Sequence, residues 1–136
     1  MPVIKKIDHI ALLTDDLEGA LVFWRDALGL ELAHLEEVAG EGAQIAFLPV
    51  GGSQVELVKP ITSDSGLARY LEKRGPGMHH LCLEVDDLTG MLTRLKAQGV
   101  QLINENPMNG SDGKKYAFIH PKSAYGVLVE LYELPK

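Results

Sequence analysis

The stretch "IDHIALLTDDLEGALVFWRDALGLEL" at residues 7–32 decides the fold, because the chain repeats it. A second copy, "HHLCLEVDDLTGMLTRLKAQGVQLI", follows at residues 79–103. His9 aligns with His80 and Leu17 with Leu88, both at an offset of 71 residues (80 − 9 and 88 − 17). A repeat of this kind indicates two copies of one structural unit, each of which leaves an apolar face for a neighbour to cover.

Each copy predicts a strand, a helix and then further strands. The acidic pairs at 15–16 and 86–87 are candidate helix N-caps, and Gly29 and Gly99 are typical helix stops. Apolar residues recur between them at helical spacing: Leu17, Leu21, Trp24 and Leu28 in the first copy, and Leu88, Leu92 and Leu95 in the second. The later segments "IAFLPVGGSQVELV" and "AFIHPKSAYGVLVELY" also correspond, so each copy is interpreted as a βαβββ unit.

The repeat gives the predicted organisation of the chain, an α+β fold of two repeated βαβββ modules. We expect module one at about residues 5–60, a linker helix at about 61–77 and module two at about 78–134, within a single domain over residues 1–136. The linker "SDSGLARYLEKRGPG" predicts a short helix and then a Gly-Pro-Gly break. We expect the second copy to cover the sheet face that the helix of the first copy leaves open.

The composition is that of an ordinary globular chain, with 46% hydrophobic and 24% charged residues. The net charge of −6 argues against nucleic acid as the main partner. The first residues lack the apolar core of a signal peptide, and the chain has no apolar run long enough for a membrane span. With one cysteine, Cys82, a disulfide framework is excluded, and we expect a cytoplasmic protein.

Strand alternation selects four side chains. Residues on one strand alternate between the two faces of a sheet, and the apolar set should lie under the helix. In 79–85 this places His80 on the other face and leaves its neighbour His79 among the apolar residues. The same test places His9, Glu56 and Glu130 on the faces away from the helices.

The four residues suggest one metal site. A single strand histidine or glutamate is usually solvated or satisfied by a neighbour, but these four are paired both by the repeat and by their face. Two imidazoles and two carboxylates suit a divalent first-row metal, and these ligand types do not choose among Co, Ni, Mn and Zn.

The whole chain resembles the vicinal oxygen chelate (glyoxalase-like) superfamily of paired βαβββ modules. Within it, the segments "GMHH", "HPKS" and "GVLVEL" resemble the methylmalonyl-CoA epimerase family. The resemblance implies a glyoxalase-like open barrel with the metal site in its cleft, and metal ligands at His9, Glu56, His80 and Glu130. It also implies a homodimer, an acyl-CoA thioester substrate and Co²⁺ as the usual ion, with Ni²⁺, Mn²⁺, Zn²⁺ or Mg²⁺ as alternatives.

The chemistry that the resemblance implies is interconversion of the 2R and 2S forms of methylmalonyl-CoA through a metal-stabilised enolate. Glu130 is then both a ligand and a catalytic base. Some epimerases carry a second glutamate at the position of Ile45, and an isoleucine moves no proton. Glu41 or a metal-bound water is the alternative there, so the second base stays unassigned. His79 is expected to have a packing or surface role.

Other functions of the same fold remain open. Glyoxalase I uses a similar four-ligand site on a glutathione hemithioacetal, and metal-free binding proteins share the scaffold. An extradiol dioxygenase needs only two histidines and one carboxylate, which Glu56 as a fourth ligand disfavours. Lys122 and Ser123 in the "HPKS" segment either contact the substrate carboxylate or shape the turn.

Overall fold

The computed structural model describes residues 2–136 and has the predicted α+β composition. Its helices are α1 (Leu17–Leu21), which continues as the π-helical turn η1 (Val22–Ala27), α2 (Gly66–Arg74) and α3 (Leu88–Ala97). Its short 3-10 turns are η2 (Ala39–Glu41) and η3 (Ser111–Gly113). Its strands are β1 (Ile4–Leu13), β2 (His34–Val38), β3 (Ala43–Val50), β4 (Ser53–Pro60), β5 (Gly77–Val85), β6 (Met108–Asn109), β7 (Lys115–Ile119) and β8 (Val129–Glu133). None of the helices within residues 2–136 is long and apolar enough to cross a membrane.

The strands are hydrogen bonded in the order β2-β3-β4-β1-β5-β8-β7-β6, so the sheet is open. The chain divides into two compact units, one formed by His9–His79 and one by the residues up to Asp8 together with His80–Lys136. In both units a strand from the start of a repeat pairs in parallel with the last strand of that repeat, β1 with β4 and β5 with β8. The two repeated modules expected from the sequence are therefore present.

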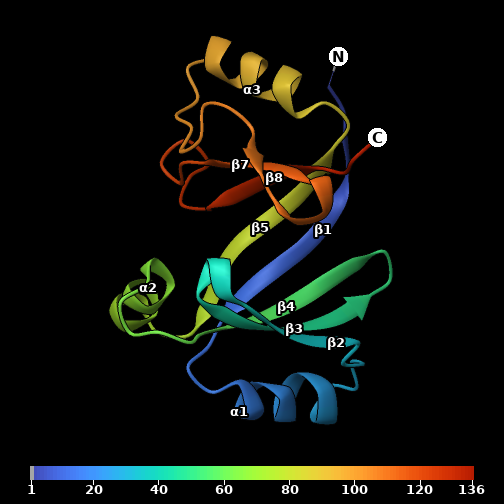
Figure 1. Cartoon of the computed structure of the whole chain (residues 1–136), viewed down its shortest axis with the longest axis vertical. Helices are drawn as coiled ribbons and strands as arrows, with labels where there is room; N and C mark the ends of the chain where they lie inside the picture. The colour runs from blue at the N-terminus through green and yellow to red at the C-terminus, as the bar shows by residue number, and fades with distance from the viewer. Residues whose placement is uncertain (1) are drawn as a thin grey trace. The chain divides into compact units, whose positions relative to one another are not determined.

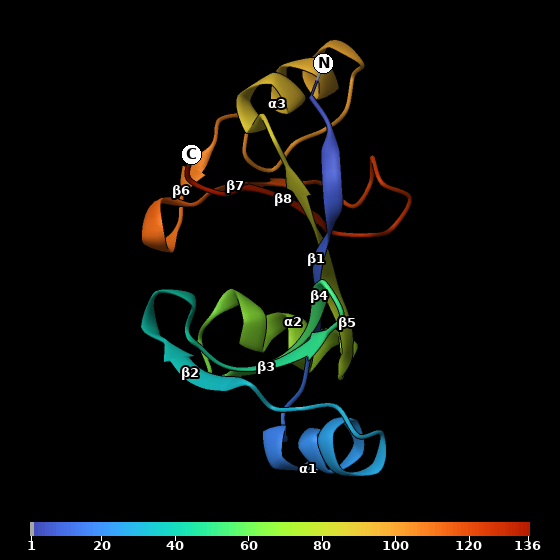
Figure 2. The same cartoon turned by 90° about the vertical axis from the view of Figure 1, so that its right-hand side faces the viewer.

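In the unit His9–His79, helices pack on both faces of the sheet (Figure 2). Leu17 and Leu21 of α1 pack against Leu57 and other residues on one face. The opposite face, which we expected the second repeat to cover, is packed by Leu67, Tyr70 and Leu71 of α2. The helix predicted in the linker thus covers the second face of this sheet, because its apolar side chains pack on the apolar residues of that face.

In the other unit, α3 lies over β7 and β8 (Figure 1). Leu88 and Leu92 are 0% and 1% exposed, like their repeat partners Leu17 and Leu21 at 6% and 1%. Apolar residues of the strands complete the core: Leu83, Val85, Ala117, Ile119, Val129 and Leu131. This core uses the apolar face that alternation predicted for the second repeat.

The helix starts resolve the choice between adjacent aspartates. Asp16 and Asp87 are the N-caps, and their carboxylates accept hydrogen bonds from the N–H groups of the residues three positions later. Gly29 and Gly99 follow the helix ends with positive φ, as expected for helix stops. The expectation that Leu28 continues the apolar helix face is wrong, since it is 54% exposed. The wider π-helical turn before it shifts the phase of the helix and rotates Leu28 outward.

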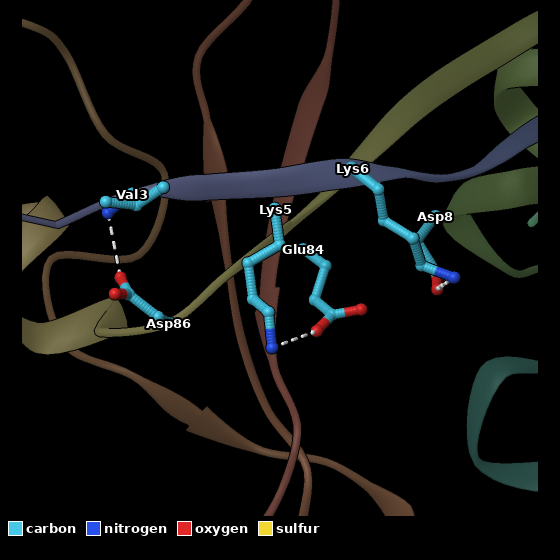
Figure 3. Close-up of polar contacts among 6 residues, drawn as sticks. All are labelled: Val3, Lys5, Lys6, Asp8, Glu84 and Asp86. Carbon is cyan, nitrogen blue, oxygen red and sulfur yellow. Dashed lines mark hydrogen bonds and ion pairs between the residues drawn. The ribbon is translucent and has the colours of Figure 1, made fainter.

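A hydrogen bond and an ion pair, shown in Figure 3, connect the start of β1 with the end of β5. The N–H of Val3 donates to Asp86 Oδ1 at 2.8 Å, and Lys5 Nζ lies 3.4 Å from Glu84 Oε2. Asp86, the aspartate that does not cap α3, therefore anchors the N-terminal strand.

Candidate functional site

The first candidate pair is His9 and Glu56, which lie on the neighbouring parallel strands β1 and β4. His9 Nδ1 is 3.2 Å from Glu56 Oε2, and the two side chains are 11% and 12% exposed. Both belong to the face away from α1, because their neighbours Leu12 and Leu57 pack against that helix. The sequence thus brings an imidazole and a carboxylate together on a largely buried face of this unit.

The second candidate pair is His80 and Glu130, on the neighbouring parallel strands β5 and β8. His80 Nε2 is 3.1 Å from Glu130 Oε1, and the side chains are 13% and 16% exposed. Both lie on the face away from α3, since Leu83 and Leu131 pack against that helix. This pair has nearly the same geometry as the first.

The two pairs occupy the same register in the two repeats. Glu56 is opposite Ala11, two residues after His9, and Glu130 is opposite Cys82, two residues after His80. On the other side of each glutamate, the antiparallel neighbour strand places a phenylalanine, Phe47 opposite Glu56 and Phe118 opposite Glu130. The ring of Phe118 also meets His80 edge to face, with centroids 5.6 Å apart. These phenylalanines are members of the site that sequence reasoning missed, and their alignment in the repeat is the signal that would have found them.

The face of His80 and Glu130 also carries Tyr132, which alternation from Glu130 would have placed there. Burial, together with the negative charges of Asp8, Glu84 and Glu130 and the Cys82 thiol, raises the pKa of Tyr132 to about 12. The phenol therefore stays neutral and keeps its proton among these acidic groups. Lys114 Nζ lies 5.5 Å from the centre of its ring.

His79 contacts the helix α2 of its own unit. Its ring meets Tyr70 of α2 edge to face, with centroids 4.7 Å apart, and Arg74 of the same helix lies over that tyrosine. This contact accounts for His79 as a packing residue between β5 and α2. Cys82 is buried opposite Glu130 on the neighbouring strand, consistent with a small wall residue.

Ile45 and Glu41 are the two residues considered in connection with a second catalytic base besides Glu130. Ile45 is 6% exposed and packs with Val58 on the same face as Glu56, so this position is apolar in the folded chain. Glu41 is exposed in the turn η2, before Gly42. Ile45 therefore supplies no carboxylate at this position.

The residues of the "HPKS" segment shape a turn. The hydroxyl of Ser123 accepts a hydrogen bond from the N–H of Gln101 at 2.8 Å, and the N–H of Lys122 donates to His120 Nδ1 at 3.0 Å. Ser123 thereby ties the loop before β8 to the segment after α3. These contacts account for the turn-forming role of the segment.

The donor atoms of both pairs fit a divalent metal ion. Two ligands at right angles on an ion with bonds of roughly 2.1 Å lie about 3 Å apart. The nitrogen–oxygen distances of 3.2 Å and 3.1 Å match this spacing in each pair. Neutral imidazole and carboxylate are ligands that first-row divalent ions accept.

The chain belongs to the Glyoxalase/Bleomycin resistance protein/Dioxygenase superfamily, whose pattern it matches over residues 8–118. This membership confirms the resemblance drawn from the sequence, and with it the glyoxalase-like fold that the resemblance implied.

Individual relatives narrow the comparison. The ethylmalonyl-CoA/methylmalonyl-CoA epimerase of Cereibacter sphaeroides is 34% identical over 134 residues, which cover 97% of this chain and 100% of that protein. The crystal structure of methylmalonyl-CoA epimerase from Mycobacterium tuberculosis is 38% identical, with a TM-score of 0.85 and coverage of 98% and 90%. A Streptomyces coelicolor methylmalonyl-CoA epimerase in complex with 2-nitronate-propionyl-CoA is 30% identical, with a TM-score of 0.86 and coverage of 97% and 96%. The chain is thus similar over nearly its whole length to enzymes that are isomerases.

Proposed function

We propose that the protein is a metal-dependent epimerase that interconverts the 2R and 2S forms of methylmalonyl-CoA. The observation that carries the proposal is the pair of His–Glu contacts at equivalent register, His9 with Glu56 and His80 with Glu130. The named activity of the full-length relatives supports the choice of substrate.

The two pairs are proposed as the two halves of one metal site. Each repeat supplies one imidazole and one carboxylate, and four such ligands leave two positions on a six-coordinate ion. Co²⁺ is the ion that the family resemblance favours, and Ni²⁺, Mn²⁺, Zn²⁺ or Mg²⁺ would suit the same ligand types. When bound, a divalent ion supplies Lewis-acid stabilisation of the negative charge that develops on the thioester oxygen.

Proton transfer is assigned to Glu130. The C2–H bond of methylmalonyl-CoA breaks, the proton passes to a carboxylate oxygen of Glu130, and the electron pair of the bond spreads toward the thioester carbonyl. The near-burial of Glu130 and its contact with His80 hold the carboxylate in one orientation, which favours transfer at a fixed carbon. Phe118, across the strand from Glu130, provides an apolar neighbour that limits the access of water.

Inversion also needs a proton on the opposite face of C2. The apolar Ile45 leaves that task to a group other than the glutamate that some family members carry there.

The remaining proposals concern the substrate, the oligomeric state and the compartment of the enzyme. It takes an acyl-CoA substrate, acts as a homodimer and works in the cytoplasm, since a chain with a single cysteine, Cys82, suits a reducing compartment.

The proposal is tested by proton exchange. The cobalt-loaded protein is incubated with one epimer of methylmalonyl-CoA in deuterated water, and deuterium entry at C2 is followed together with inversion. We expect both to occur, and to disappear when the metal is removed with a chelator. A folded, metal-loaded protein without exchange would contradict the epimerase, and turnover of glutathione hemithioacetal in its place would assign glyoxalase I. Unchanged ligand binding after complete metal removal, with no turnover of either substrate, would assign a metal-free binding protein.

A further inference from the structure

Tyr132 follows Glu130 on the same face of β8. Leu131, the residue between them, packs in the core under α3, so the side chains of Glu130 and Tyr132 both lie on the opposite face. Two residues of a strand span about 6.6 Å, which is the spacing expected between the two backbone positions. The proposed catalytic base therefore has a phenol as its neighbour along the strand.

The hydroxyl of Tyr132 has no partner in the described part of the chain. The side chain is half-buried, and no group within residues 2–136 forms a hydrogen bond with this hydroxyl. The ring is held from one side, since Lys114 Nζ lies 5.5 Å from its centre. A tyrosine placed away from water usually finds a partner for its hydroxyl, so this oxygen is available to a bound molecule.

The charges around Tyr132 define what such a molecule must offer. Asp8, Glu84 and Glu130 surround the phenol with negative charge. Glu84 is 5% exposed, and its carboxylate pairs with Lys5 Nζ at 3.4 Å. Ionised carboxylates only accept hydrogen bonds, whereas a phenol at neutral pH carries a proton that it can donate. Tyr132 is thus an uncharged donor that fits an oxygen acceptor of a ligand.

The proposed substrate carries suitable oxygens close to the reacting carbon. When C2 of methylmalonyl-CoA lies at the carboxylate of Glu130, the thioester carbonyl and the free carboxylate are each bonded directly to C2. A carbon–oxygen group of this kind and one hydrogen bond together reach about 5 Å from C2. This reach approaches the spacing of about 6.6 Å between the two residues, so a modest tilt of the tyrosine side chain brings its hydroxyl to one of these oxygens.

We propose that Tyr132 is a substrate-binding residue that donates a hydrogen bond to an oxygen of the malonyl group. This inference rests on the proposed function, because it takes a malonyl thioester as the substrate and places C2 at Glu130. The hydrogen bond fixes the rotation of the malonyl group relative to the carboxylate that removes the proton. Its loss changes the affinity for the malonyl group by about tenfold.

The test measures the affinities of malonyl-CoA, propionyl-CoA and free CoA by calorimetry on the metal-loaded full chain. Tyr132→Phe removes the hydroxyl and keeps the ring, and we expect it to weaken malonyl-CoA binding about tenfold while the affinity for free CoA stays unchanged. A parallel loss for propionyl-CoA, which has no free carboxylate, assigns the thioester carbonyl as the acceptor. A loss confined to malonyl-CoA assigns the carboxylate.

The matched control is Tyr116→Phe. Tyr116 is half-buried and lies opposite Tyr132 on the neighbouring strand β7, so its position is diagonal to Glu130. We expect this variant to bind all three ligands with wild-type affinity. Both variants should keep the wild-type Tm, because neither substitution removes a ring.

Other outcomes overturn the inference. An unchanged affinity for malonyl-CoA in Tyr132→Phe, or an equal loss for all three ligands, would show that the hydroxyl does not contact the malonyl group. The same loss in Tyr116→Phe would remove the assignment to Tyr132. Because no turnover is measured, a malonyl-CoA affinity that depends on the Tyr132 hydroxyl in a protein without epimerase activity would uphold the inference and refute only the proposed reaction.

Discussion

Replacing Glu130 with glutamine separates catalysis from folding. The side chain is 16% exposed and has its carboxylate 3.1 Å from His80, so the isosteric amide keeps the shape and one polar contact. Exchange of a charge-assisted contact for a neutral one costs about 1 kcal/mol of stability, or roughly 3–4 °C in Tm for a chain of this length. The loss of a catalytic base lowers the rate by about 10³-fold, equivalent to about 4 kcal/mol of barrier.

The matched control is Glu56→Gln. Its contact with His9 has nearly the same length, 3.2 Å, and the side chain is 12% exposed, so the effect on Tm should be the same. Glu56 is assigned a ligand role only, and we therefore expect this variant to keep most of its exchange rate when the metal is saturating. The assay is deuterium entry at C2 of methylmalonyl-CoA, measured with both variants at equal metal occupancy. An equal loss of rate in the two variants, or a Glu130→Gln enzyme as fast as the wild type, would refute the assignment of Glu130 as the base.

Three further outcomes follow from the fold and the site. Leu21 and Leu92 are buried at equivalent positions of the two repeats, so Leu21→Ala and Leu92→Ala should each lower the free energy of unfolding by about 2–5 kcal/mol. Thermal denaturation measures this loss, and a value below about 1 kcal/mol in either variant would contradict the packing described. Tyr132 has a pKa raised to about 12 from 10.0, so its contribution to stability is present below pH 10 and lost as the pH rises through 12. In an ultraviolet titration Tyr132→Phe should remove the ionisation near pH 12, and its persistence would reject the assignment. Removing a metal present at about 100 times its Kd should lower stability by about 2.7 kcal/mol, and an unchanged Tm would argue against a site shared by the two pairs.

The fold was predictable because both repeats carry the same helix-capping residues and the same pattern of apolar residues. Leu17 and Leu88 follow capping aspartates at the same offset, and both are buried at the start of their helices. The docking of α2 on the sheet was not predictable, since a short amphipathic helix carries no information about which surface it will meet. The π-helical turn that exposes Leu28 also left no mark in the spacing of apolar residues.

The site was only partly visible in the sequence. Strand alternation was sufficient to select His80 and Glu130, because it assigns each residue to a face without any knowledge of distant contacts. Alternation could not predict the raised pKa of Tyr132, because the acidic residues that contribute to it, Asp8 and Glu84, come from β1 and β5, far away in the chain. The second proton carrier left no pattern at all, because Ile45 replaces the residue type that would have marked it.

The central claim is that the two repeats share a single metal ion, and its most direct test is the stoichiometry of Co²⁺ binding. The metal-free protein is titrated with Co²⁺, and binding is followed by calorimetry and by the visible absorption of the ion. One equivalent per chain is predicted, with His9→Ala and His80→Ala each weakening the binding of that same ion. Two independent equivalents per chain, each lost in only one of the two variants, would show that the His–Glu pairs are separate sites and would contradict the account.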